Sequence, residues 1–134
     1  MRGRRPETMQ TVPVLDVPKA PSWLDRDAKS EWKRIAPILS TDRRVLSLAD
    51  LATLANYCAA VGQVAAAGRI IATEGIIFKS ESGPKKHPAV GIQQGAMMQA
   101  RLLAGELGLT PTSRSRAALR DDPADDADND LGLE

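Results

Sequence analysis

The sequence predicts a mainly α-helical protein, in which two long helices form a helical hairpin with a short β-hairpin or extended segment between them. Apolar residues recur at helical spacing in three separate stretches, and glycine and proline mark where these stretches end or begin. Aromatic side chains make up only 3% of the 134 residues. Alanine, leucine and isoleucine supply most of the apolar content, which favours helices packed through small residues over a β-sandwich. The length fits one modest domain with tails.

The N-terminal residues 1–21 are expected to form an extended, mostly disordered arm, because they carry four prolines and show little periodicity. The tip of this arm is positively charged, and its arginines are candidate phosphate contacts: Arg2, Arg4 and Arg5. Residues 22–108 are expected to be the helical core and the oligomerisation domain.

The first helix is predicted from about Asp25 to Leu39, with Asp25 as its N-cap. Pro37 should distort its last turn, because proline lacks the N–H that the helix needs. One face carries the apolar residues, at i, i+4, i+7, i+8 and i+11: Ala28, Trp32, Ile35, Ala36 and Leu39. The opposite face is interpreted as solvated and carries Lys29, Lys33 and Arg34.

A polar connector at residues 40–44 should follow, and a capping box at Ser47–Asp50 should open a second helix that runs to about Thr73 and stops at Gly75. Roughly 25 residues give a rod of roughly 38 Å. A rod of this length is too extended for the core of an isolated small monomer, so we expect its small-residue face to contact another copy of the chain. The residues assigned to this oligomer interface are Leu51, Ala55, Cys58, Gly62, Ala65 and Gly68.

Two short extended segments, residues 76–79 and 85–87, are predicted to pair around a Gly83-Pro84 turn. Pro88 should occupy the first position of a third helix over residues 88–107, with Gly108 as its stop. Residues 109–120 form a basic segment that is expected to hold a short helix, from residue 112 or 113 to about residue 119.

Charge is segregated along the chain. Residues 1–120 carry all 18 Lys and Arg with 10 acidic residues, a net charge of +8, whereas residues 121–134 carry seven acidic residues and no basic ones, a net charge of −7. We call residues 121–134 the acidic tail and expect it to be disordered. A basic body suggests a polyanionic partner, and the tail either competes with that partner, recruits another, or only keeps the protein soluble.

The sequence favours no enzymatic chemistry. It has no G-x-x-x-x-G-K phosphate loop, no G-x-S-x-G elbow and no second cysteine for a metal site, so we expect no catalytic residues, no metal and no cofactor. The lone His87 is interpreted as a structural residue where the hairpin meets the third helix. Cys58 is expected to be a small buried hydrophobe in a reducing compartment. No apolar run approaches the ~20 residues of a membrane span, which predicts a soluble, cytoplasmic protein.

The remaining candidates for function are cationic clusters. They lie before the second helix (Arg43, Arg44), in the hairpin (Lys79, Lys85, Lys86) and in the last basic stretch (Arg114, Arg116, Arg120). Repeated around an oligomer, such clusters would form a positive ring whose affinity for DNA comes from avidity. The interval 23–61 also admits a helix-turn-helix interpretation, although its turn lacks the usual glycine.

Several motifs resemble one branch of the phage terminase small subunits. They are Pro21-x-Trp23-Leu24 followed by Trp32, Leu48-x-x-Leu51, Tyr57-Cys58, Lys85-Lys86-His87-Pro88-Ala89 and above all the segment LGLTPTSRSR at residues 107–116. The resemblance implies a homo-oligomeric ring, nine subunits being the best guess, in the host bacterial cytoplasm. It further implies binding to double-stranded viral DNA at the packaging initiation site and stimulation of the large terminase subunit, an ATPase and nuclease.

On this hypothesis the DNA phosphates are held by Arg114 and Arg116, with help from Lys85, Lys86 and the N-terminal arginines, and sequence choice comes partly from DNA bending. The acidic tail then docks the large subunit or masks the basic surface. Two other classes stay open. One is a small dimeric regulator of transcription that reads an operator with its first two helices, and the other is a helical adaptor that binds no nucleic acid.

Overall fold

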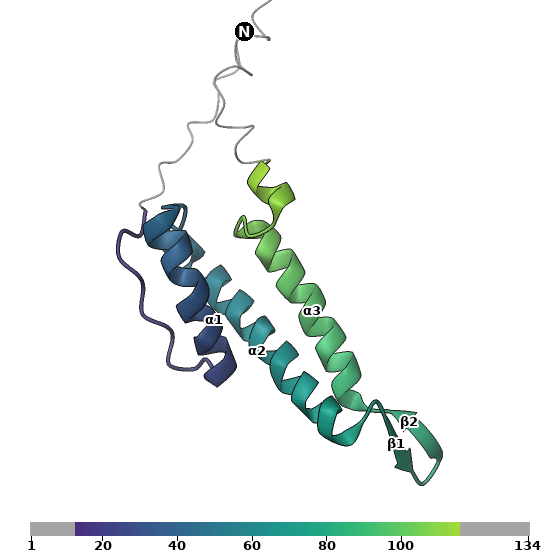
Figure 1. Ribbon diagram of the computed structural model, residues 1–134. Coiled ribbons are helices and arrows are strands. Elements are labelled where there is room, and N and C mark those ends of the chain that lie inside the picture. Colours follow the sequence, from purple (N-terminus) through teal and green to yellow (C-terminus); the bar gives the residue numbers. More distant parts are fainter. Residues whose placement is uncertain (1–12, 116–134) are drawn as a thin grey trace, which may run out of the picture.

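This computed structural model describes residues 13–115, which contain three helices of 12 or more residues, a short helical segment at 111–115 and a two-stranded antiparallel sheet. The elements are α1 (Arg26–Pro37), α2 (Leu51–Glu74), β1 (Ile77–Ser80), β2 (Gly83–Lys86) and α3 (Pro88–Glu106). The predicted mainly α architecture, with a β-hairpin between two long helices, is confirmed. Figure 1 shows α1 beside the first half of α2 and α3 running back along α2.

The start and the buried face of α1 follow the prediction. The Asp25 carboxylate accepts a hydrogen bond from the Ala28 N–H at 2.8 Å, as an N-cap does. The predicted stripe is the core face, with every member at most 4% exposed: Ala28, Trp32, Ile35, Ala36 and Leu39. The amphipathic pattern in the sequence thus predicted both the helix and the face that it buries.

The segment after Pro37 differs from the expected polar connector. The chain continues as one π-helical turn over Ile38–Asp42, in which the Arg43 N–H donates to the Ile38 carbonyl at 2.8 Å. Ser40 is fully buried and donates its hydroxyl to the Ala36 carbonyl at 2.6 Å. A wide turn fits here, because Pro37 supplies no N–H to the preceding helical ladder.

Residues 13–21 are not a disordered arm. The Val14 N–H donates to the Leu46 carbonyl at 2.8 Å, and the Trp32 indole N–H donates to the Pro18 carbonyl at 2.8 Å. These two long-range bonds fasten an extended segment to the helical core, which the local composition did not reveal. The expected basic tip with Arg2, Arg4 and Arg5 lies outside the described residues.

The second helix begins and ends as predicted. Ser47 and Asp50 form the capping box, in which the Ser47 N–H donates to the Asp50 carboxylate at 3.0 Å. Leu48–Asp50 form a first 3-10 turn, and Gly75 ends the helix with a φ of 83°. The 24 residues of α2 span about 36 Å.

Half of the expected oligomer interface lies inside the subunit. Ala55 and Cys58 are 4% and 0% exposed in the core that α1 and α2 share. Gly62 is buried where α1 begins, and a Cβ there would lie 2.8 Å from Asp25 Oδ1. The assignment of these three residues to contacts between copies is therefore wrong, because α1 of the same chain covers them. Leu51, Ala65 and Gly68 are half-buried.

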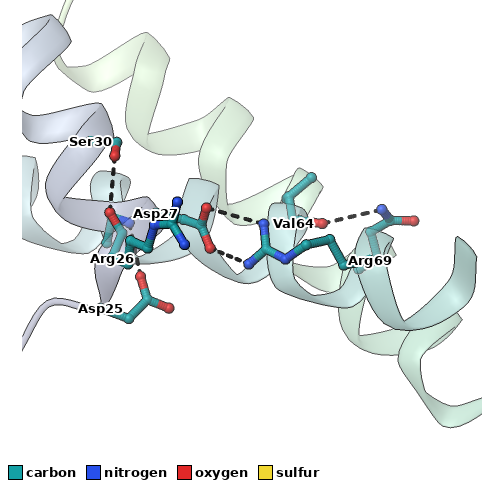
Figure 2. A network of polar contacts seen from close by, with 8 residues as sticks. Asp25, Arg26, Asp27, Ser30, Val64 and Arg69 are labelled. Carbon is teal, nitrogen blue, oxygen red and sulfur yellow. Dashed lines mark hydrogen bonds and ion pairs between the residues drawn. The ribbon is translucent and has the colours of Figure 1, made fainter. Parts of the chain in front are cut away.

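An ion pair joins the start of α1 to the C-terminal half of α2. Figure 2 shows the Arg69 guanidinium facing the Asp27 carboxylate, to which its Nη1 donates at 3.1 Å and its Nη2 also donates. The hydrogen bond from Arg69 lowers the pKa of Asp27. Arg69 is thus engaged in holding two helices together.

Beyond α1, the second half of α2 pairs with α3 to form an arm that ends in the hairpin (Figure 1). This arm has no third layer among the described residues, and many large apolar side chains stay exposed on it and along the rest of α3. They are Ile70, Ile76, Ile77, Phe78, Ile92, Met97, Met98 and Leu102.

The hairpin turn lies earlier than predicted. Glu81 and Ser82 form the turn, whereas Gly83 and Pro84 already belong to β2 and pair with Ser80 and Lys79. Gly83 takes a φ of 105°, which suits glycine at the turn's exit, and Pro84 is tolerated because both strands of a two-stranded sheet are edges.

Candidate nucleic-acid interface

The motif LGLTPTS at residues 107–113 is a helix stop followed by a helix start. The Leu109 N–H donates to the Ala104 carbonyl at 2.9 Å and the Gly108 N–H donates to the Gly105 carbonyl at 3.2 Å, while Gly108 has a φ of 70°. This is the Schellman pattern that closes a helix.

A new helical segment begins at Pro111, directly after Thr110. The Ser113 N–H donates to Thr110 Oγ1 and the Thr110 N–H donates to Ser113 Oγ, both at 3.2 Å, a reciprocal cap around Pro111. Residues 111–115 are helical, in keeping with the predicted short helix, whose remainder lies outside the described residues. The motif therefore turns the chain sharply and sets Arg114 at the end of α3.

Two candidate arginines meet at this end of the molecule. Arg43 Nη1 donates to the Gly108 carbonyl at 2.9 Å, and Arg114 Nη1 donates to the Leu109 carbonyl at 2.9 Å. Carbonyls past a helix C-terminus carry partial negative charge, so cations are favoured there. Each guanidinium has five N–H donors, and this contact occupies one of them.

A third arginine joins them through a buried acid. Glu31 is 9% exposed and accepts hydrogen bonds from Arg34 Nε and from the Tyr57 hydroxyl, both at 2.9 Å. The Glu31 contact raises the pKa of Arg34. Burial, then the Glu31 hydrogen bond, raises the pKa of Tyr57 to about 12. Glu31 thus fixes the orientation of Arg34, whose side chain is still 61% exposed.

These three arginines line one cavity, which we call the arginine pocket. Its volume is about 440 Å³, and Arg34, Arg43 and Arg114 share its wall with Tyr57 and Leu109. Among the described residues, the lining itself includes no carboxylate, although the Glu31 carboxylate binds two lining residues, Arg34 and Tyr57, and offsets the charge of Arg34. A neighbouring cavity of about 350 Å³ shares Arg43 and Arg114 but also contains acidic residues, Asp50 and Glu106, in its wall. The arginine pocket is therefore the more favourable place for an anion.

The hairpin carries a separate basic cluster of exposed lysines, Lys79, Lys85 and Lys86. Strand pairing sets Lys86 opposite Ile77 and Lys79 opposite Pro84, so Lys79 and Lys86 share one face of the hairpin. Figure 1 shows the hairpin at one end of α2 and the Arg114 segment at the other. Arg114 and the lysines therefore lie at opposite ends of one subunit and do not form one surface within it.

The other predicted residues fall in two groups. Arg44 is exposed beside the arginine end and adopts a φ of 53°, which is uncommon outside glycine. Arg116 and Arg120 lie outside the described residues. Arg34 was missed, because the helical pattern placed it on a solvated face. Its spacing of three from Glu31 was the available signal, since such pairs meet on a helix.

The lone histidine and the lone cysteine are structural, as predicted. His87 caps α3 through Nδ1, which accepts from the Ala89 N–H at 3.0 Å, and its Nε2 lies 2.6 Å from the Glu74 carboxylate. Cys58 is fully buried, which raises the pKa of its thiol to about 12. Among residues 13–115, no three His, Cys, Asp or Glu side chains are grouped as a metal site requires. None of the described helices is both long and apolar enough to cross a bilayer.

Comparison with known proteins points in one direction. Searches of curated proteins and of solved structures gave no match. A family described as "Phage terminase, small subunit" matches residues 28–124, a range that includes most of α1 and all of α2, the hairpin, α3 and the LGLTPTSRSR segment. Because this match spans well over half of the 134 residues, the chain belongs to the phage terminase small subunit family.

Proposed function

We propose that this terminase small subunit is a non-enzymatic, ring-forming protein of the host bacterial cytoplasm. It binds double-stranded viral DNA at the packaging initiation site, and it recruits and stimulates the large subunit that drives packaging. The arginine pocket is the observation that carries the DNA-binding part of this proposal. Three guanidinium groups converge there with free N–H donors, and the chain continues from it with Arg116 and Arg120.

The DNA contacts proposed for the described residues are Arg34, Arg43, Arg44 and Arg114, with the hairpin lysines as a second contact region at the other end of the subunit. Guanidinium groups match phosphate oxygens in pairs and so position a duplex without reading its sequence. Affinity then depends strongly on salt, because bound phosphates release counterions.

Salt-dependent DNA binding tests this assignment. Arg44→Asn and Arg114→Gln remove two charges whose side chains are exposed, and asparagine tolerates the positive φ at position 44. The slope of log affinity against log salt should decrease by about 0.9 for each phosphate contact that is lost. Lys29→Gln, an exposed lysine on α1, is the control. If the double variant keeps the slope and the affinity of the unmodified protein, the arginine end is not the DNA surface.

The assembly part of the proposal is supported by the exposed faces of the arm. Residues 88–100 of α3 carry no charged side chain, yet Ile92 and Met98 are 57% exposed. On the same helix, Gly91 and Gly95 have no neighbour within 4 Å of a built Cβ. Exposed apolar surface without charges is typical of subunit contacts. This face replaces the buried residues of α2 as our proposed interface, and nine copies remain the proposed count.

Mass measurement tests the assembly. Ile92→Glu and Met98→Glu should convert a large oligomer into a folded monomer by light scattering, because two carboxylates would be buried without partners. Lys33→Glu on the exposed side of α1 should leave the mass unchanged. Unmodified protein that is monomeric at high concentration would exclude the ring.

The regulator alternative is disfavoured by the position of α2. A recognition helix must enter the major groove, whereas α2 is covered by α1 and α3. At the start of α2 and in the 3-10 turn before it, the exposed residues Leu48, Ala49 and Ala52 offer no hydrogen-bonding groups to base edges, and Asn56 is the first exposed side chain of α2 that does. A dimer that binds one operator by this helix would overturn that argument.

A further inference from the structure

The acidic tail starts close to the arginine pocket. Arg114 lines the pocket and Ser115 is the last described residue. Asp121, the first residue of the tail, follows Ser115 by six positions. Six residues span at most about 20 Å, since an extended chain covers about 3.3–3.6 Å per residue. The tail therefore begins within reach of the pocket of its own chain.

The charges of the two parts are complementary. The tail carries seven carboxylates and no cation, whereas the pocket wall carries three guanidinium groups, of which, within the described part of the chain, only that of Arg34 is paired with an acid, Glu31. Carboxylates and phosphates make the same paired contacts with guanidinium groups, so the tail offers the chemistry of a DNA backbone. The same wall also contains the apolar Leu109 and the Tyr57 ring, which offer apolar contacts to the two leucines of the tail, Leu131 and Leu133.

We propose that the acidic tail binds in the arginine pocket of its own chain and is displaced there by DNA. The tail is thus a built-in competitor that weakens binding to nonspecific DNA, while a site that makes additional contacts still displaces it. The contact between tail and pocket stands on the charges and the chain path, whereas its effect on DNA rests on the proposed function.

Tethering makes a weak contact effective. A connection of only six residues keeps the start of the tail near the pocket, which corresponds to an effective concentration on the order of 1 mM. If the free tail peptide binds with a dissociation constant of about 0.1 mM, the state with the tethered tail bound is about ten times more populated than the state with an empty pocket. Removing its charges should then raise apparent DNA affinity about tenfold at ~0.1 M salt, and less at higher salt because exposed pairs are screened.

The receptor for the first experiment is a full-length neutral-tail variant, in which the six tail aspartates become asparagine and Glu134 becomes glutamine. A fluorescent peptide of residues 121–134 is titrated into it and followed by anisotropy. We expect saturable binding that is at least tenfold weaker in the unmodified protein, whose own tail competes. Arg114→Gln should weaken peptide binding severalfold, and Lys29→Gln, which removes the same charge elsewhere, should not. Equal loss in both variants, or no saturable binding, overturns the proposal.

The second experiment measures DNA affinity in the same proteins. The neutral-tail variant should bind a short duplex about tenfold more tightly than the unmodified protein, and this gain should largely disappear when Arg114→Gln is also present. A gain of the same size in both backgrounds indicates general charge repulsion by the tail and overturns the proposed competition. Saturable, Arg114-dependent peptide binding with no change in DNA affinity upholds the tail contact and instead removes the arginine end as the DNA surface.

Discussion

Gly62 is the position at which one added methyl group tests the packing of α1 on α2. A Cβ there would lie 2.8 Å from Asp25 Oδ1, 3.0 Å from the Ala28 backbone nitrogen and 3.1 Å from the Ala28 Cβ. Two of these atoms form the N-cap hydrogen bond of α1. Since the Ala28 backbone cannot turn aside as a flexible side chain does, Gly62→Ala must push α1 outward or break its cap.

The expected change in the free energy of unfolding combines two destabilising effects and one stabilising effect. Overpacking costs about 1–3 kcal/mol, and loss of an Asp N-cap costs about 1 kcal/mol. Alanine in place of glycine within a helix returns about 1 kcal/mol. We expect a net destabilisation of about 2 kcal/mol, which lowers the melting temperature by roughly 8–16 °C for a domain of about this size.

Thermal and urea unfolding followed by circular dichroism measure this effect. Gly105→Ala is the matched control, because no atom lies within 4 Å of a Cβ built at Gly105. The control should be unchanged or stabilised by up to about 1 kcal/mol. In an Asp25→Ala background the cost of Gly62→Ala should fall, since the nearest clashing atom is gone and the two changes are coupled. If Gly62→Ala stabilises the protein as the control does, the close approach of the two helices is refuted.

Three further predictions concern buried and capping groups. Tyr57, the single tyrosine, should titrate near pH 12 in an absorbance experiment. Because its folded pKa lies above the ordinary value of 10, the stability it contributes is complete below pH 10 and is lost as pH rises through 12; titration at 10 in the folded protein contradicts the burial of the Tyr57 hydroxyl and its hydrogen bond to Glu31. The buried Cys58 should react with a disulfide reagent on the order of 100-fold more slowly in the native protein than in denaturant, and equal rates would show an open core. His87→Ala should destabilise the fold by about 1 kcal/mol in urea unfolding while His87→Asn keeps most of the cap, and equal stability of both variants would remove His87 as the N-cap.

The structure gives the LGLTPTS and Lys86-His87-Pro88 segments a structural role. The segment LGLTPTS closes α3 and opens the next helix through backbone and hydroxyl hydrogen bonds. The Lys86-His87-Pro88 segment likewise ends β2 and caps α3. Both segments therefore form turns, and these turns place their cationic side chains at opposite ends of the subunit.

What the sequence by itself determined is local. The N-cap at Asp25, the capping box at Ser47, the start of α3 at Pro88 and the stop at Gly108 depend on hydrogen bonds within a few residues, so the pattern of side chains predicts them. The core face of α1 was equally readable, because one apolar stripe has only one way to be buried.

What only the tertiary structure decided is which surfaces meet. A small-residue stripe on α2 packs equally well against a helix of the same chain or of another copy, so the sequence could not reveal that α1 covers Gly62. The pocket depends on contacts between residues 65 and 26 positions apart, Arg43 with Gly108 and Glu31 with Tyr57. Such contacts follow from the path of the whole chain, and no local pattern of residues encodes them.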